Sequence, residues 1–239
     1  MSRLEDALNK AYQSPAPTRL PGTPRQPSSA VGQASEIQSL SSLYTNIQLA
    51  LPDVARPIIA FTSAVPKEGV TSILYHLGGL ISREKKVLLV DFNILSPGLH
   101  KFMQVDNIKG LSDVLQGKKG LADCIPESLN PNLDVLPCGP TGAASFQIMG
   151  SGVVRSLLAE MRSVYDVVLV DCPSLRNFPD AAILCALCDG VVLVVKTRKT
   201  KREVIQYSQE LLVKAGAREL GVVLNRVRYY IPEFIYRRL

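Results

Sequence analysis

Short runs of aliphatic residues, set between longer segments of helical periodicity, constrain the fold of this chain more than any other feature. The runs are apolar at consecutive positions rather than at alternate ones. This pattern is typical of strands that are covered on both faces, as in a parallel sheet. The sequence therefore predicts strands at residues 57–63, 87–91, 167–171, 191–195 and 220–225, with a sixth at 132–137.

Segments with helical spacing separate these strands. They lie at residues 71–84, 110–116, 151–164, 180–187 and 201–215. Strands that alternate with helices are typical of a doubly wound α/β domain, in which a mostly parallel sheet is flanked by helices. We predict this fold class for a domain that begins near Glu36 and includes residues 36–239.

Two different segments precede the predicted domain. Residues 14–35 hold five prolines, two glycines and four serines, and no acidic or aromatic residue. Such a composition cannot bury enough apolar surface to offset its ordering entropy, so we expect a flexible linker. Residues 1–13 form a short predicted helix in which Leu4, Leu8 and Ala11 share one face. A helix this short is marginal alone, so it either docks on another surface or frays.

Composition and charge limit the class of protein. The 239 residues are 46% hydrophobic and 20% charged, as in globular proteins. No apolar run approaches the roughly 18 residues that span a bilayer, and no secretory signal opens the chain, so we expect a soluble cytoplasmic protein. Residues 196–239 hold eleven Lys or Arg against four Glu. This basic segment could face anionic lipid, nucleic acid or an acidic partner, or it could be a solvated helix face.

Informative polar residues follow three of the predicted strands. Ligands of open parallel sheets bind at the carboxyl ends of the strands. Residues 63–72 join the first strand to a helix, and a loop that enters a helix N-terminus offers backbone N–H groups to phosphate. Asp91 and Asp171 each follow a hydrophobic strand, where carboxylates can hold Mg²⁺ directly or through water. The sequence thus predicts a phosphate and magnesium site at this edge of the sheet.

Residues 36–239 resemble the P-loop ATPase domain of bacterial tyrosine kinases, a family in the MinD/ParA-like branch of P-loop NTPases. Residues 63–72 are similar to the phosphate-loop pattern S-x-x-P-G-E-G-K-[ST]-[ST], and residues 91–97 to D-x-D-x-R-x-P. Residues 169–174 resemble the Walker B strand of the family. Residues 43–48 resemble the end of a helix that the family uses for contact between subunits.

The resemblance implies a set of cofactors and functional residues. ATP or ADP and Mg²⁺ would be the cofactors, and Thr71 and Asp171 would hold the Mg²⁺. Asp91 and Asp171 would be the catalytic carboxylates. The nucleotide would contact Lys67, Glu68, Gly69, Val70, Thr71, Ser72 and Asn225. Because these kinases phosphorylate tyrosines of their C-terminal tail, the corresponding acceptors would be Tyr229, Tyr230 and Tyr236.

The departures from the family pattern fall on positions that carry chemistry. Val70 stands where the phosphate-binding lysine is usual. Loss of one partner of a desolvated charge pair typically costs about 2–5 kcal/mol, or roughly 30- to 3000-fold in binding. Asn93 and Leu95 replace an acidic residue and an arginine, and the contact helix has lost a Glu and two Arg to Gln38, Ser41 and Tyr44. We therefore predict that Asp91 and Asp171 are vestigial and that catalysis is weak or absent.

The sequence leaves three functions open. The first is a degenerate kinase-like regulator or scaffold in exopolysaccharide or capsule biosynthesis and export. It would bind the cytoplasmic part of a membrane polysaccharide co-polymerase, or an active kinase relative, at the inner face of the plasma membrane, and could form homo-oligomers. The second is an active ATPase and tyrosine autokinase that controls polysaccharide polymerisation, with the missing charge supplied by Lys67 or by a neighbouring subunit. The third is a MinD/ParA-type positioning ATPase, which Val65 disfavours because that branch has a signature lysine there. Nothing resembles base readout, so nucleic acid is not an expected partner.

Overall fold

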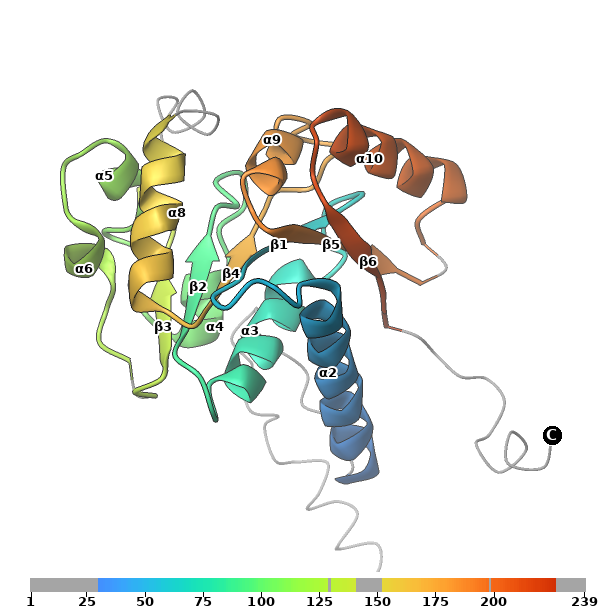
Figure 1. Cartoon of the computed structure of the whole chain (residues 1–239), viewed down its shortest axis with the longest axis horizontal. Helices are drawn as coiled ribbons and strands as arrows, with labels where there is room; N and C mark the ends of the chain where they lie inside the picture. The colour runs from blue at the N-terminus through green and yellow to red at the C-terminus, as the bar shows by residue number, and fades with distance from the viewer. Residues whose placement is uncertain (1–29, 129, 141–151, 198, 227–239) are drawn as a thin grey trace, which may run out of the picture.

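The computed structural model describes residues 30–128, 130–140, 152–197 and 199–226. These residues form a six-stranded sheet in the order β3-β2-β4-β1-β5-β6, and each hydrogen-bonded pair of strands is parallel (Figure 1). The chain therefore has the doubly wound α/β fold that its sequence predicts. The strands are β1 (Ile58–Ser63), β2 (Val87–Asp91), β3 (Leu133–Leu136), β4 (Val167–Asp171), β5 (Gly190–Lys196) and β6 (Glu219–Asn225).

Helices cover both faces of the sheet, which explains why its central strands are continuously apolar. One layer contains α2 (Ala30–Ala50), α3 (Val70–Ile81) and α4 (Leu99–Met103). The other layer contains α5 (Leu111–Leu115), α6 (Leu121–Cys124), α8 (Gly152–Val164), α9 (Ala181–Ala186) and α10 (Arg202–Lys214). Side chains of each central strand alternate between the two layers. In β1, for example, Ile59 and Phe61 pack toward α3, whereas Ile58 and Ala60 pack into the opposite core.

The predicted strands are confirmed, each to within one residue at either end. The prediction is wrong at the start of the domain, because α2 begins at Ala30 and residues 30–35 are helical rather than part of a linker. The last linker proline is Pro27, and alanines with high helix propensity follow it. Helices α4 and α6 were not predicted, since they are too short to show a period. The predicted helix at 1–13 and the tail tyrosines Tyr229, Tyr230 and Tyr236 lie outside the described residues.

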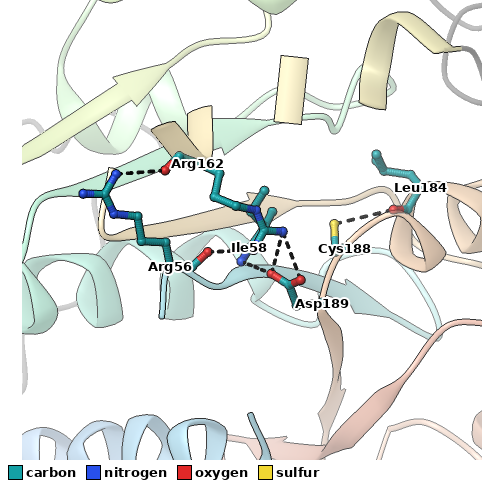
Figure 2. Close-up of polar contacts among 6 residues, drawn as sticks. All are labelled: Arg56, Ile58, Arg162, Leu184, Cys188 and Asp189. Carbon is teal, nitrogen blue, oxygen red and sulfur yellow. Dashed lines mark hydrogen bonds and ion pairs between the residues drawn. The ribbon is translucent and has the colours of Figure 1, made fainter. Parts of the chain in front are cut away.

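A polar network joins the helical layer of α8 to the amino ends of β1 and β5 (Figure 2). Arg162 forms an ion pair with Asp189 at 2.9 Å, and the same carboxylate accepts a hydrogen bond from the amide of Ile58 at 2.7 Å. Arg56 donates to the carbonyl of Ser163 at 2.8 Å, while Arg162 donates back to the carbonyl of Arg56 at 2.9 Å. This network fixes the edge of the sheet opposite the predicted site.

Candidate functional site

The segment between β1 and α3 forms a tight loop at the carboxyl edge of the sheet. Lys67 has a φ of 66° and Gly69 a φ of 97°, both in the left-handed region that favours glycine. Gly69 is the N-cap of α3, and a Cβ added there would collide with the side chain of Asn225. The N–H groups in the first turn of α3 have no acceptor within the helix, which suits an anion. The loop therefore has the backbone shape of a phosphate cradle.

A buried carboxylate anchors this loop to the neighbouring strands. Glu68 is only 2% exposed. One of its oxygens accepts from the amide of Val65 at 3.1 Å, and the other accepts from the amide of Lys196 at 3.0 Å and from the hydroxyl of Thr200. Its backbone carbonyl accepts from the side-chain amide of Asn225 at 2.8 Å. The loop is thus tied to the ends of both β5 and β6 with no ligand required.

Two carboxylates meet beside the loop, as the sequence predicts. Asp91 and Asp171 are paired across β2 and β4, and both are fully buried. Asp171 accepts a hydrogen bond from the hydroxyl of Thr71 at 2.6 Å through Oδ2, while its Oδ1 has no hydrogen-bond partner within the described residues. Asp91 accepts from the amides of Gly98 at 2.9 Å and Leu99 at 3.0 Å. Thr71, Asp91 and Asp171 therefore lie together at the head of α3.

Burial governs the electrostatics of this carboxylate pair. It raises the pKa of Asp91 to about 6, although the backbone amides that donate to Asp91 act in the opposite direction. Burial and then the charge of Asp91 raise the pKa of Asp171 well above its usual range, which the hydrogen bond from Thr71 partly opposes. The described residues hold no group of three or more His, Cys, Asp or Glu side chains that could bind a metal by themselves. A divalent cation here would need further oxygen ligands, such as the hydroxyl of Thr71, water or phosphate.

Comparison with characterised proteins identifies the family. No family model matches the chain. It is 32% identical over 197 residues to the tyrosine-protein kinase YwqD of Bacillus subtilis, covering 80% of this chain and 83% of that protein. The chain belongs to the bacterial tyrosine-protein kinase family. It is also 28% identical over 201 residues to the tyrosine-protein kinase Wzc of Salmonella typhimurium, of which it spans only 28%.

Solved structures agree with this membership. The chimerical protein CapA2B2 matches with a TM-score of 0.76 and 28% identity, over 86% of this chain and 88% of the chimera. The septum site-determining protein MinD of Pyrococcus horikoshii, solved with Mg-ADP, matches with a TM-score of 0.60 and 25% identity, over 76% of each chain. The fold is thus that of P-loop NTPases of the tyrosine-kinase and MinD-like type.

Val70 is the first residue of α3, directly after the loop. Its side chain is 8% exposed and lies in the apolar cluster that includes Phe61 and Leu74. An uncharged side chain therefore faces the core at the position where the sequence resemblance implies a phosphate-binding lysine. Within the described residues, the ion pair is Arg162–Asp189, at the opposite edge of the sheet. No Lys or Arg side chain in that part of the chain forms an ion pair with Asp91 or Asp171.

The other predicted site residues fall into three groups. Gly69 lies on the loop and Ser72 lies in the first turn of α3, and both are half-buried. Lys67 is exposed at the tip of the loop. Asn225 touches the loop backbone, so it belongs to the site. Sequence reasoning missed Lys196 and Thr200, which hold Glu68 from the end of β5. Their position at and just after the end of β5 places them at this edge of the sheet, but the sequence holds no signal for their contact with Glu68.

Proposed function

We propose that this chain is a degenerate member of the tyrosine-kinase family that regulates or scaffolds exopolysaccharide or capsule biosynthesis and export, with catalysis weak or absent. Membership of the family supports the general role. The buried valine at position 70 is the observation that carries the loss of catalysis. The chain would act by binding partners rather than by turning over nucleotide.

The proposed site keeps groups that fit Mg²⁺ and a loop that fits phosphate in shape, but it lacks a cation for the charge of the phosphate. Thr71 and Asp171 fit Mg²⁺, because one carboxylate oxygen is buried without a partner and hard cations prefer oxygen ligands. When bound, Mg²⁺ would neutralise phosphate charge. The loop also fits a phosphate in shape, since Glu68 holds it in place. It does not fit in charge, because Val70 offers no cation where a triphosphate concentrates its negative charge.

The size of this deficit favours binding over turnover. An absent charge partner in a desolvated site costs about 2–5 kcal/mol, equivalent to roughly 30- to 3000-fold in affinity. A charge aimed at the transferring phosphoryl group also stabilises the transition state, so the rate would fall at least as far. Asn93 and Leu95, which replace an acid and an arginine of the family pattern, add no compensating charge.

The proposed partner is the cytoplasmic part of a membrane polysaccharide co-polymerase, or an active kinase relative, and the chain could also form homo-oligomers. Helix α2 supports this choice, because it resembles the family's contact helix and presents Thr45 and Asn46, which match the family pattern, to solvent. In the described part of the chain, no helix is long and apolar enough to cross a bilayer. We place the chain at the inner face of the plasma membrane through its partner, with its basic C-terminal segment as a second contact.

An active autokinase is the second candidate, and Lys67 favours it. This lysine lies on the phosphate loop, is exposed, and occupies a left-handed conformation that usually requires glycine. In that case Lys67 would supply the missing charge, and Tyr229, Tyr230 and Tyr236 would be the acceptors.

A replacement experiment in the organism that carries the chain separates the two functions. If the chain is a scaffold, its deletion should lower polysaccharide output. Thr71→Val, which removes the hydroxyl beside Asp171 but keeps the volume of the side chain, should leave output unchanged. Phosphotyrosine on the purified natural chain should be absent. If Thr71→Val lowers output as far as deletion does, or if the natural chain carries phosphotyrosine that Lys67→Ala removes, the autokinase is correct.

A further inference from the structure

Strand β6 forms an open edge of the sheet. It pairs with β5 and lies at the outer end of the strand order (Figure 1), and no strand of the described residues pairs with its other side. The amide of Thr197, just after β5, donates to the carbonyl of Asn225 at 3.0 Å, so the backbone of Asn225 faces β5. The backbone groups of successive residues in a strand point alternately to its two edges. Those of Val222 and Leu224 therefore point away from β5, toward the open edge.

The side chains of the same two residues are apolar and exposed. Val222 is 41% exposed and Leu224 is 59% exposed. Val223 between them packs toward the core of α2 and α3, and side chains alternate along a strand, so Val222 and Leu224 point to the other face. Natural proteins usually blunt such an edge, because an exposed apolar strand is a template for another chain. Here the pairing register skips Leu220, and this bulge interrupts only the start of the strand.

Positively charged side chains gather at the carboxyl end of this edge. Lys196 ends β5, Arg226 directly follows β6, and Lys199 lies between β5 and α10. Desolvation lowers the pKa of Lys196, and the charges of Arg226 and Lys199 lower it further, against the opposing charge of Glu68. None of the three cations forms an ion pair within the described residues. Uncompensated positive charge therefore lies beside the open half of the strand.

These features together select an extended polypeptide with acidic side chains. The outward backbone groups of Val222 and Leu224 need an occupant that both donates and accepts at a spacing of about 7 Å, as an extended backbone does. A lipid surface offers acceptors but no ladder of donors at this spacing. Apolar side chains at alternate positions of the segment would lie beside those of Val222 and Leu224, and its carboxylates would meet the cations at the end of the strand.

We propose that the open edge of β6 accepts an extended acidic segment of a partner protein, which joins the sheet as an additional strand. Hydrogen bonds with the backbone of Val222 and Leu224 provide affinity, as in other cases of strand addition. Lys196, Lys199 and Arg226 provide the preference for acidic residues. The inference goes beyond the proposed function and does not depend on whether the phosphate site is active.

The test measures binding of two fluorescein-labelled synthetic peptides, each about eight residues long, to the full chain. Fluorescence anisotropy should show that a peptide of alternating valine and glutamate binds at least about tenfold more tightly than one of alternating valine and lysine. Leu224→Pro removes an amide that points to the open edge, where proline is tolerated, and should weaken binding of the acidic peptide at least about tenfold. Lys196→Glu combined with Arg226→Glu should do the same. Lys214→Glu, at an exposed lysine of α10, is the matched control and should leave binding unchanged.

Hydrogen exchange gives a second measurement at the edge itself. The amides of Val222 and Leu224 should exchange rapidly in the free chain and slowly with saturating acidic peptide. The amide of Val223, which points to β5, should exchange slowly in both cases. Thermal unfolding of each variant checks that the fold is intact.

Each other outcome overturns the proposal. If the acidic peptide does not bind, or binds Leu224→Pro equally well, the edge does not accept a strand. Equal binding of the two peptides means that the cations do not select acidic residues. Slow exchange of both amides without peptide assigns the edge to a second copy if it is lost on dilution, and to another part of the same chain if it persists. Binding to vesicles of anionic lipid through Lys196 and Arg226, without peptide binding, assigns the cations to a membrane surface.

Discussion

The hydroxyl of Thr71 donates to one oxygen of Asp171 at 2.6 Å, and the other oxygen of that carboxylate is buried without a hydrogen-bond partner among the described residues. Asp171 of β4 lies beside Asp91 of the adjacent strand β2. Two acids therefore share a buried space in which Asp171 has too few donors to be satisfied as an anion. A proton or a divalent cation resolves this imbalance, and each possibility leads to a prediction.

If a proton neutralises this carboxylate pair, the folded chain should lose stability as the pH rises. Because burial raises the folded pKa of Asp91 to about 6 and that of Asp171 well above its usual range, the folded state binds more protons than the unfolded state once the pH rises above about 4. The contribution of the pair is complete below about pH 4 and is lost as the pH passes through 6 and above. Urea unfolding at pH 5 and pH 8 should show a lower free energy of unfolding at pH 8 for the natural chain, and a smaller difference for Asp171→Asn. Equal differences in the two proteins would mean that the carboxylate pair does not bind the proton that stabilises the fold.

Magnesium should stabilise the chain without nucleotide. A cation that binds only the folded state adds about 1.4 kcal/mol when present at tenfold its Kd. We expect Mg²⁺ to raise the unfolding temperature of the natural chain at pH 8, where the carboxylates are least protonated. Asp171→Asn should abolish the rise, and NaCl at equal ionic strength controls for screening. A rise of the same size in Asp171→Asn would show that Mg²⁺ acts elsewhere.

Removing the anchor of the phosphate loop should be costly. Glu68→Ala leaves the amides of Val65 and Lys196 without their acceptors, and each buried unsatisfied group costs about 1–3 kcal/mol. We expect a loss of about 2–5 kcal/mol in the free energy of unfolding. Glu84→Ala, at an exposed glutamate, is the control and should change stability by less than about 0.5 kcal/mol. Equal stability of the two variants would mean that the loop does not depend on Glu68.

The network at the opposite edge of the sheet gives an independent test of the fold. Asp189→Ala removes the acceptor of the Ile58 amide and of Arg162 (Figure 2). The ion pair is partly exposed and contributes little, so the cost should be about 1–2 kcal/mol, chiefly from the amide. Arg162→Met, which keeps most of the side-chain volume, should cost less than Asp189→Ala in urea unfolding. The reverse order would assign the stability to the ion pair.

The central strands β1, β2, β4 and β5 were predictable because burial on both faces leaves a continuous apolar signature at each of them. The start of α2 at Ala30 was not, since linker-like composition extends past the last proline, Pro27, into the first residues of the helix. Asp91 and Asp171 were predictable from their place after strands. The anchoring of Glu68 was not, because its acceptor role depends on the backbone amide of Lys196, which is far away in sequence and would be the same for any residue type.

On our proposal, Val70 deprives the site of its phosphate cation. Isothermal titration with Mg-ATP tests it directly on three proteins: the natural chain, Val70→Lys and Val70→Met, the last of which matches the length of lysine without its charge. We expect Val70→Lys to bind at least about 30-fold more tightly than the other two. Binding of Mg-ATP by the natural chain with the affinity of Val70→Lys would contradict the claim.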